Sequence, residues 1–353
     1  LNIIKQSRPE TSEVKSVKEN ILWGPSPRAS LALMTTCRAK AFLENRYSPS
    51  VFDVQSLVKP ILSHRLKLNI SAKSENVNIE EILDDAAQYG DDIVVNLDGS
   101  GEATLNKNLV KYIEAVATRG MKPLIYTNGW LVRGNRMREM FDAGLYLCRF
   151  SDIGYDRKTY KEWMRKDAFD RIVENARAAV DYVEVQGYDA IVSSYHLILD
   201  NDNIDYEIEQ YRKNFIEPAG TEAEIWKMHN WSGNLENLRS RDGEVSTCGR
   251  PFAPDFTVRS GGIGKHYGAV TPCCQTMGPP NEIPSVLGHM DTQSIAEVIN
   301  GEGYQNLRKA HKTGDWSLAP YCENCDFRVQ DPEVLVWTNN GDHVKKENMR
   351  ATK

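Results

Sequence analysis

Residues 29–45 read ASLALMTTCRAKAFLEN, and the interpretation of the whole chain depends on this stretch. Its first eight residues are small and apolar and lead up to Cys37, which is the pattern of a buried strand that ends in a loop. In α/β folds the loops at the carboxyl ends of the strands carry the chemistry. A cysteine cluster in such a loop would hold a metal, but here Cys37 is followed by Ala41 and Glu44. The expected loop therefore offers only one cysteine as a metal ligand.

Beyond residue 78, apolar runs of strand length alternate with amphipathic helices. The expected strands are 92–97, 123–126, 145–150, 190–199 and 224–228, and the expected helices begin near residues 78, 109, 137, 158 and 205. With the opening strand this makes six strand–helix units, an alternation typical of a parallel sheet with right-handed crossovers. We therefore expect an α/β fold, a partial (β/α)6 TIM-like barrel that works at the carboxyl ends of its strands.

The alternation stops around Ser232–Val245, where the composition turns polar, so we expect a domain boundary there. The expected order is an N-terminal arm over residues 1–28, the barrel over 29–235, a small cysteine-rich domain over 236–327 and a loosely packed tail over 328–353. Pro60 is expected to break or kink a helix in the segment around it.

The bulk composition excludes several classes of protein. A net charge of −6 and a pI near 5.8 argue against a nucleic-acid binder or a protein of anionic membranes. No apolar run approaches the roughly 18 residues that span a bilayer, and the polar start is unlike a secretory signal. Seven cysteines with one Cys-x-x-Cys pair fit metal ligation in a reducing compartment better than a disulfide scaffold. We therefore expect a cytoplasmic protein.

Four late cysteines have the spacing of a metal centre. Cys322 and Cys325 form a Cys-x-x-Cys pair, and Cys248 and Cys273 complete a set of four. Zinc and a 4Fe–4S cluster both satisfy these ligands on spacing alone. Cys274 could take the place of Cys273.

With the strands and the four cysteines in place, the chain resembles the radical SAM superfamily with a C-terminal SPASM or twitch domain, from about Ser30 to Phe327. The motifs that carry the resemblance are Gly99-Ser100-Gly101-Glu102-Ala103 in the place of the family's Gly-Gly-Glu-Pro, Thr127-Asn128-Gly129, Ser151-Asp152, and the ordered set Gly268, Gly288, Leu307-Arg308, His311 and Cys322-x2-Cys325-x-Phe327. Each motif is weak alone, and their ordered conjunction is strong.

The resemblance implies cofactors and roles for particular residues. Ser100, Gly101 and Glu102 would receive the amino end of S-adenosyl-L-methionine (SAM), Asn128 would belong to the same site, and Ser151 would face the ribose. The four late cysteines would hold one auxiliary 4Fe–4S cluster, as in the single-cluster twitch arrangement. A small-molecule substrate and an electron-donor protein would be the partners.

The opening loop departs from the family. The family has Cys-x3-Cys-x2-Cys there, whereas this chain aligns Cys37, Ala41 and Glu44. Alanine is no ligand, and a carboxylate suits an iron–sulfur cube poorly. One thiolate should not retain a SAM-cleaving cluster, so a second 4Fe–4S cluster is not expected.

Three functions compete. The first is an enzyme of SAM-dependent radical oxidation or rearrangement with an altered cluster loop. The second is a pseudoenzyme that keeps the auxiliary cluster for structure, electron transfer or partner binding. The third, which we rank lowest, is a non-redox enzyme that uses Glu44, Glu102 and His229 as acid–base groups.

Other residues have simpler interpretations. Cys148 is expected to be a buried small hydrophobe, and His196, within a strand, to pack in the core. His229 ends the last strand, where contact with a ligand and plain packing are equally expected. His311 is expected to order the cysteine domain rather than to ligate.

Overall fold

The computed structural model describes residues 2–14, 17–18, 21–62, 67–68, 79–90, 92–99, 101–233, 247–260, 266–276, 285–328 and 335–339. Internal contacts divide the chain into two compact units, residues 1–76 and 77–353. The boundary between the two units therefore lies between residues 76 and 77. The sequence had predicted the first boundary after residue 28.

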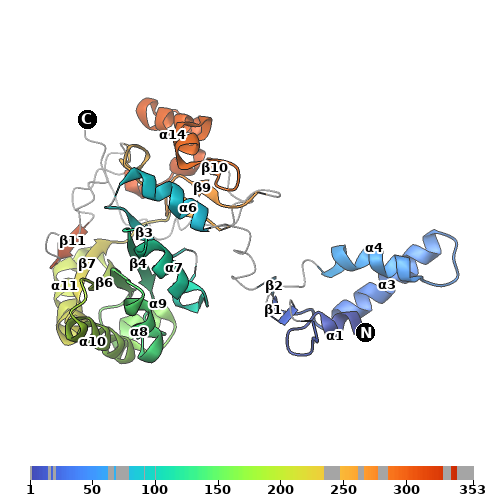
Figure 1. Ribbon diagram of the computed structural model, residues 1–353, viewed down its shortest axis with the longest axis horizontal. Coiled ribbons are helices and arrows are strands. Elements are labelled where there is room, and N and C mark those ends of the chain that lie inside the picture. Colours follow the sequence, from blue (N-terminus) through green and yellow to red (C-terminus); the bar gives the residue numbers. More distant parts are fainter. Residues whose placement is uncertain are drawn as a thin grey trace. The chain divides into compact units, whose positions relative to one another are not determined.

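The N-terminal unit is mainly helical (Figure 1). Its elements are α1 (Asn2–Gln6), β1 (Ile21–Trp23), α3 (Arg28–Leu43), α4 (Val51–Leu62) and β2 (Lys67–Leu68), and the two short strands pair antiparallel. The helices α3 and α4 pack on each other through a small apolar core that includes Leu33, Cys37 and Ile61. The expected extended arm therefore contains a helix, and α4 continues past Pro60 to its end at Leu62.

The expected opening strand is wrong, because residues 28–43 form one helix. Ala29, Leu33, Cys37 and Ala41 are its buried residues, and they recur every four positions. Residues four apart lie on the same face of a helix. The apolar run is therefore the inner face of α3 rather than a strand that ends in a loop.

The second unit is built on a six-stranded sheet with the order β11-β7-β6-β5-β4-β3. Its strands are β3 (Val94–Asn96), β4 (Lys122–Thr127), β5 (Leu147–Ser151), β6 (Ile191–Ile198), β7 (Glu222–Lys227) and β11 (Leu335–Thr338). Neighbouring strands from β3 to β7 pair parallel, and β11 adds antiparallel to β7. Five of the expected strands are confirmed, and the sheet is that of a partial TIM-like fold.

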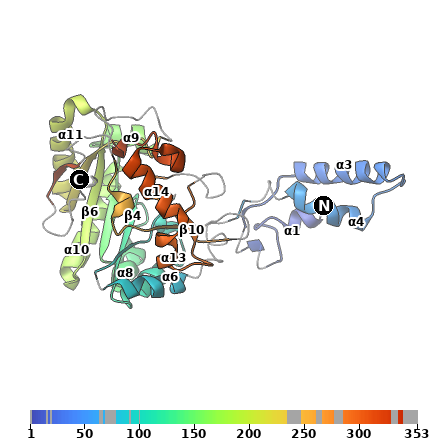
Figure 2. The same ribbon diagram turned by 90° about the horizontal axis from the view of Figure 1, so that it is seen from above.

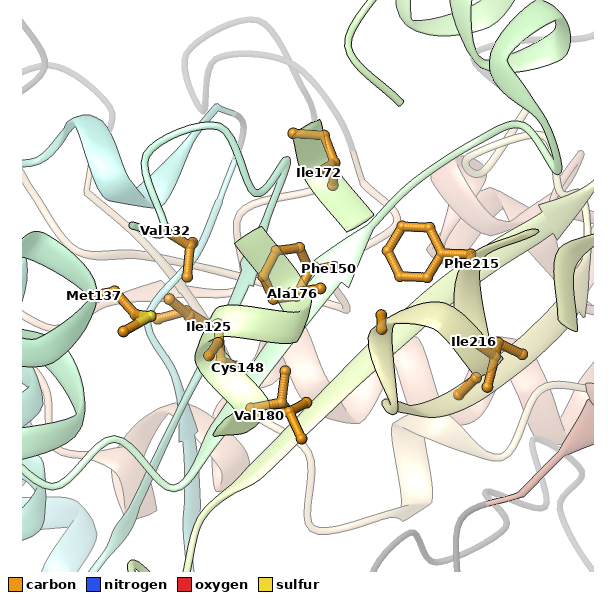
Figure 3. Close-up of a cluster of buried hydrophobic side chains, with 14 of the residues drawn as sticks. Ile125, Val132, Met137, Cys148, Phe150, Ile172, Ala176, Val180, Phe215 and Ile216 are labelled. Carbon is orange, nitrogen blue, oxygen red and sulfur yellow. The ribbon is translucent and has the colours of Figure 1, made fainter. Parts of the chain in front are cut away.

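Helices follow the strands in turn, as expected. They are α6 (Ile79–Ala86), α7 (Leu109–Ala117), α8 (Gly134–Asp142), α9 (Arg157–Met164), α10 (Phe169–Gln186), α11 (Ile204–Tyr211), a π-helical turn (Arg212–Ile216) and α12 (Glu217–Ala219). Residues such as Ile125, Phe150 and Ile172 fill the main core between the sheet and its helices (Figure 3). Cys148 is fully buried in the same core beside Ile125, which confirms it as a small hydrophobe.

The C-terminal part holds a small antiparallel sheet with the order β10-β9-β8. Its elements are β8 (Thr257–Arg259), β9 (Ala269–Thr271), β10 (Gly288–His289), α13 (Ile295–Asn300) and α14 (Glu302–Thr313). Figure 2 shows α10 and α14 on opposite sides of the large sheet. The backbone N–H of Ile295 donates to Asp85 at 2.6 Å, which joins α13 to the segment around α6. Most of the expected boundary at Ser232–Val245 lies outside the described residues.

The expected loose tail is wrong for residues 335–339. The strand β11 lies at the edge of the large sheet, where the side-chain amide oxygen of Asn339 accepts from the backbone N–H of Ala223 at 2.6 Å. Trp337 packs against the main core. Within the described residues, no helix has the length and apolar character needed to cross a membrane.

Candidate functional site

The four late cysteines line one cavity. Cys248, Cys273, Cys322 and Cys325 share its wall with Ser232, Arg250, His311, Phe327 and Arg328. The cavity measures about 370 Å³ when the solvent at its mouth is included. The four cysteines, which lie up to 77 residues apart in the sequence (248 to 325), therefore line a single cavity.

The large sheet positions the Cys-x-x-Cys turn through Asn230, which follows β7. The Asn230 backbone N–H donates to the Asp326 carboxylate at 2.8 Å, and its side-chain amide donates to the Asn324 carbonyl at 2.8 Å. The Asp326 backbone N–H returns a bond to the Asn230 side chain at 3.2 Å. Next in the chain, the Ser232 hydroxyl contacts the Cys325 sulfur at 3.8 Å. The turn is thus bound to the end of a strand.

Cys273 and Cys274 differ sharply in their surroundings. Cys273 lines the cavity, whereas Cys274 is exposed and is absent from the cavity wall. The Cys274 sulfur accepts hydrogen bonds from Arg250 at 3.4 Å and Gln275 at 3.7 Å. The geometry therefore favours Cys273 as the fourth ligand.

Burial keeps the four thiols protonated. It raises the pKa of Cys273 to about 11, and it raises the pKa values of Cys248, Cys322 and Cys325 as well. The neighbouring thiols contribute in the same direction, because like charges disfavour ionisation. Thiolate formation at this site therefore needs a cation that displaces the protons.

The chemistry of the donor set fits an iron–sulfur cluster. Four thiolates around one cavity are the usual ligands of a 4Fe–4S cube. A single zinc ion would draw all four sulfurs to about 2.3 Å. Across the described part of the chain, no three His, Cys, Asp or Glu side chains form a group that could hold one metal ion. The donor set is therefore compatible with a 4Fe–4S cube.

Glu102 joins the loop after β3 to the loop after β4. Its carboxylate accepts from the backbone N–H of Asn128 at 2.7 Å, the Thr127 hydroxyl at 2.7 Å and the backbone N–H of Thr104 at 3.1 Å. The Thr104 hydroxyl donates to it as well. A carboxylate has about four acceptor sites, and these donors use them. A ligand amine could bind Glu102 only by displacing one of them.

The other residues expected at the SAM site lie at the same edge of the sheet. Gly101 directly precedes Glu102, and Asn128 caps the turn after β4 by accepting from the Trp130 backbone N–H at 3.0 Å. Ser151 is half-buried at the end of β5, paired in register with Tyr195. Ser100 lies outside the described residues. Three of the predicted positions, with Glu102, therefore share one edge, and their roles stay predictions.

Asp152, which follows Ser151, is a buried acid to which the sequence argument gave no separate role. It is fully buried, and neither carboxylate oxygen has a hydrogen-bond partner among the described residues. Burial, reinforced by the Glu102 charge, raises its pKa well above the usual range. The site therefore favours the protonated form of Asp152.

The residues expected in the opening loop have structural roles in the N-terminal unit. Cys37 and Ala41 are buried on the inner face of α3. Glu44 follows the end of the helix and pairs with Lys40 at 2.7 Å and with Arg46, which together hold its pKa below the ordinary value. The expectation that these residues form a loop at a strand end is wrong.

The histidines within the sheet mainly pack. His196 is fully buried, bonds to Glu207 at 2.8 Å and stacks on Tyr211, which agrees with a core role. His229 is buried between Trp231 and Phe327, at ring-centroid distances of 4.0 and 5.0 Å. With Glu44 ion-paired and His229 packed, the structure adds no support to an acid–base site.

A buried polar pair that the sequence argument missed crosses the face of the sheet. Arg149 on β5 and Glu224 on β7 form two hydrogen bonds at 3.1 and 3.2 Å, and Arg149 also donates to Tyr126 at 3.0 Å. Because the partners lie 75 residues apart on different strands, only the strand order could have revealed the pair.

Three family models match the chain. The Radical SAM superfamily model matches residues 63–211, the SPASM iron–sulfur cluster-binding domain matches 265–326, and the AAA lid domain matches 15–86. The radical SAM match begins after Cys37 and contains a single cysteine, Cys148.

The chain is also similar to individual proteins. An uncharacterized protein of Methanocaldococcus jannaschii is 26% identical over 157 residues, which cover 44% of this chain and 52% of that protein. The chain thus spans about half the length of the curated relative it matches. BtrN and SuiB are two of the solved structures to which the chain is similar. BtrN in complex with AdoMet and 2-DOIA has 16% identity and a TM-score of 0.42, over 73% of this chain and 83% of that chain. Streptococcus suis SuiB bound to S-adenosylmethionine has 15% identity and a TM-score of 0.43, over 70% and 63%.

Proposed function

We propose that this chain, which matches the Radical SAM superfamily over residues 63–211 and the SPASM domain over residues 265–326, is a one-cluster iron–sulfur protein that transfers electrons and does not cleave SAM. Cys248, Cys273, Cys322 and Cys325 would hold the cluster. A bound cluster supplies one-electron redox chemistry. The observation that carries the proposal is the convergence of these four thiols, and of no other cysteine group in the described chain, on one cavity.

The loss of the SAM-cleaving centre is supported by the position of Cys37. A strand-end loop with three cysteines would normally lie within the radical SAM region, but residues 63–211 contain only Cys148. Cys148 is fully buried in the main core, and its pKa is raised far above the ordinary value, so it offers no thiolate. The shortage of cysteines in residues 63–211 therefore supports a chain without a working SAM-cleaving cluster loop.

Electron transfer is supported by the exposure of the cysteine cavity. Cys273, Cys322 and Cys325 are only partly buried, and Cys274 beside them reaches solvent. A cluster in this place would lie close to the surface, where an electron-donor protein can approach. The protein would support electron transfer in two ways. The Asn230–Asp326 hydrogen bond fixes the turn that carries two of the thiols, and Phe327 covers part of the cavity wall.

A SAM-dependent enzyme with a small-molecule substrate is the second candidate. The bonds between Glu102, Thr127 and Asn128 favour it, because they keep the expected SAM-binding edge in order. This candidate requires that SAM bind and be cleaved without a cysteine loop.

Incubation of the reconstituted, dithionite-reduced protein with SAM separates the two candidates. We expect a reducible cluster and no 5′-deoxyadenosine above the level of a protein-free control. Cys37→Ala should keep the same iron content, because Cys37 packs within α3. Formation of one equivalent or more of 5′-deoxyadenosine would overturn the proposal, and its loss in Cys37→Ala would assign the activity to Cys37.

A further inference from the structure

His311 is the one histidine among the described residues that lines the cysteine cavity. It lies on α14, whose buried face also carries Tyr304, Leu307 and Ala310. Its side chain is only 7% exposed, so the imidazole is held inside the protein. Trp316 stands perpendicular to the ring at a centroid distance of 5.0 Å and fixes its plane.

The hydrogen bonds of His311 define its tautomer. The backbone N–H of Cys248 donates to Nδ1 at 3.3 Å, and the Thr247 hydroxyl lies 2.8 Å from the same nitrogen. A backbone N–H can only donate, so Nδ1 is the acceptor and the single ring proton sits on Nε2. A protonated Nε2 has no lone pair for a metal, which excludes His311 as a ligand in this arrangement.

The Nε2–H group has no hydrogen-bond partner among the described residues, although it is buried. A buried donor left unpaired costs about 1–3 kcal/mol, so such groups in native proteins usually have a partner. Here the donor belongs to a side chain that lines the cavity of the four cysteines. The natural partner is an acceptor that occupies this cavity.

We propose that Nε2–H of His311 donates a hydrogen bond to a sulfur of the bound cluster and thereby raises its reduction potential. This inference rests on the proposed function, since it takes a cluster as the occupant. Reduction adds negative charge to the cluster sulfurs. A hydrogen-bond donor therefore stabilises the reduced cluster more than the oxidised cluster, which raises the reduction potential. His311 is thus a positioning and tuning residue rather than a ligand.

Two substitutions separate this role from simple packing. His311→Leu fills similar space without a donor, and we expect a lower midpoint potential at unchanged iron content. The expected size is about a tenfold lower ratio of reduced to oxidised cluster at the wild-type midpoint, or about 59 mV for a one-electron couple. His311→Gln retains an N–H donor and should return most of the shift. His266→Leu, which removes a histidine outside the cavity wall, should leave the potential unchanged.

The experiment is a spectroelectrochemical titration of the anaerobically reconstituted full chain and the three variants. An equal midpoint potential in the wild type and in His311→Leu would overturn the inference. If His311→Leu loses its cluster, pulsed EPR of the reduced wild-type protein labelled with ¹⁵N-histidine tests the hydrogen bond instead. A ¹⁵N coupling to the cluster that disappears in His311→Gln would support the hydrogen bond. The absence of any such coupling in the wild type would overturn the inference. A wild-type protein without iron would refute the proposed function itself.

Discussion

At the scale of single residues, two adjacent cysteines show how surroundings decide function. Cys273 lines the cavity, whereas Cys274 is exposed, is absent from the cavity wall and accepts a hydrogen bond from Arg250. The sequence could not choose between them, because their spacing to the other cysteines differs by one position. The choice depends on the direction of each side chain after β9.

The first prediction compares these two positions. Cys273→Ser should lose most of the bound iron, because a hydroxyl is a poor ligand for an iron–sulfur cluster. Cys274→Ser is the matched control and should retain wild-type iron and the wild-type visible spectrum. Iron and sulfide analysis after anaerobic reconstitution measures both. Iron loss in Cys274→Ser with retention in Cys273→Ser would reverse the assignment.

The second prediction concerns the buried acid Asp152. Its pKa is raised in the folded state, so folding favours the protonated form. The stabilising effect of this proton is complete below the unfolded pKa of about 4 and is lost as the pH rises toward the folded pKa, by about 1.4 kcal/mol per pH unit. Asp152→Asn should therefore be more stable than the wild type at pH 7 but gain nothing near pH 3. Urea unfolding at both pH values tests this, and an equal gain at the two would contradict a raised pKa for Asp152.

At the scale of elements, the sequence predicted the parallel strands well and the N-terminal helices poorly. Strands β4 to β7 are buried along most of their length and follow helices of clear period, so two signals agree. In α3, residues 29–36 are uniformly small or apolar, and the four-residue spacing of the buried face becomes clear only when Cys37 and Ala41 are included. A short apolar run does not distinguish a strand from a buried helix.

The strand β11 was missed for a different reason. It is a run of only four residues, Leu335–Thr338, and its partner β7 lies more than 100 residues earlier. The sequence around such a short run does not indicate which strand it will pair with. The same holds for Arg149 and Glu224, whose contact depends on the order of the strands.

The third prediction tests the turn after β4. Gly129 has φ of +70°, and an added Cβ would lie 2.5 Å from the Phe150 ring. Gly187, at the end of α10, has φ of +68° with open space around it. Gly187→Ala should cost about 1–2 kcal/mol for the left-handed backbone alone. Gly129→Ala should cost about 1–3 kcal/mol more because of overpacking. Equal losses in thermal or urea unfolding would show that the turn can shift away from Phe150.

At the scale of the whole second unit, the cysteine cavity depends on the large sheet. The loop after β7 holds the Cys-x-x-Cys turn through Asn230, and α13 is joined to Asp85 near α6. The cysteines were predictable from their spacing, since Cys-x-x-Cys has a direct chemical reason. The supporting bonds were not, because they join residues up to 210 positions apart.

The direct test of the account is the amount of iron and acid-labile sulfide per chain after anaerobic purification, with zinc measured alongside. We predict about four irons and four sulfides, as in one 4Fe–4S cluster. The double variant Cys322→Ser/Cys325→Ser should remove them, and Cys37→Ala should not. About eight irons would show that a second cluster exists and that the radical SAM centre was wrongly excluded. Zinc without iron would contradict the proposed redox function.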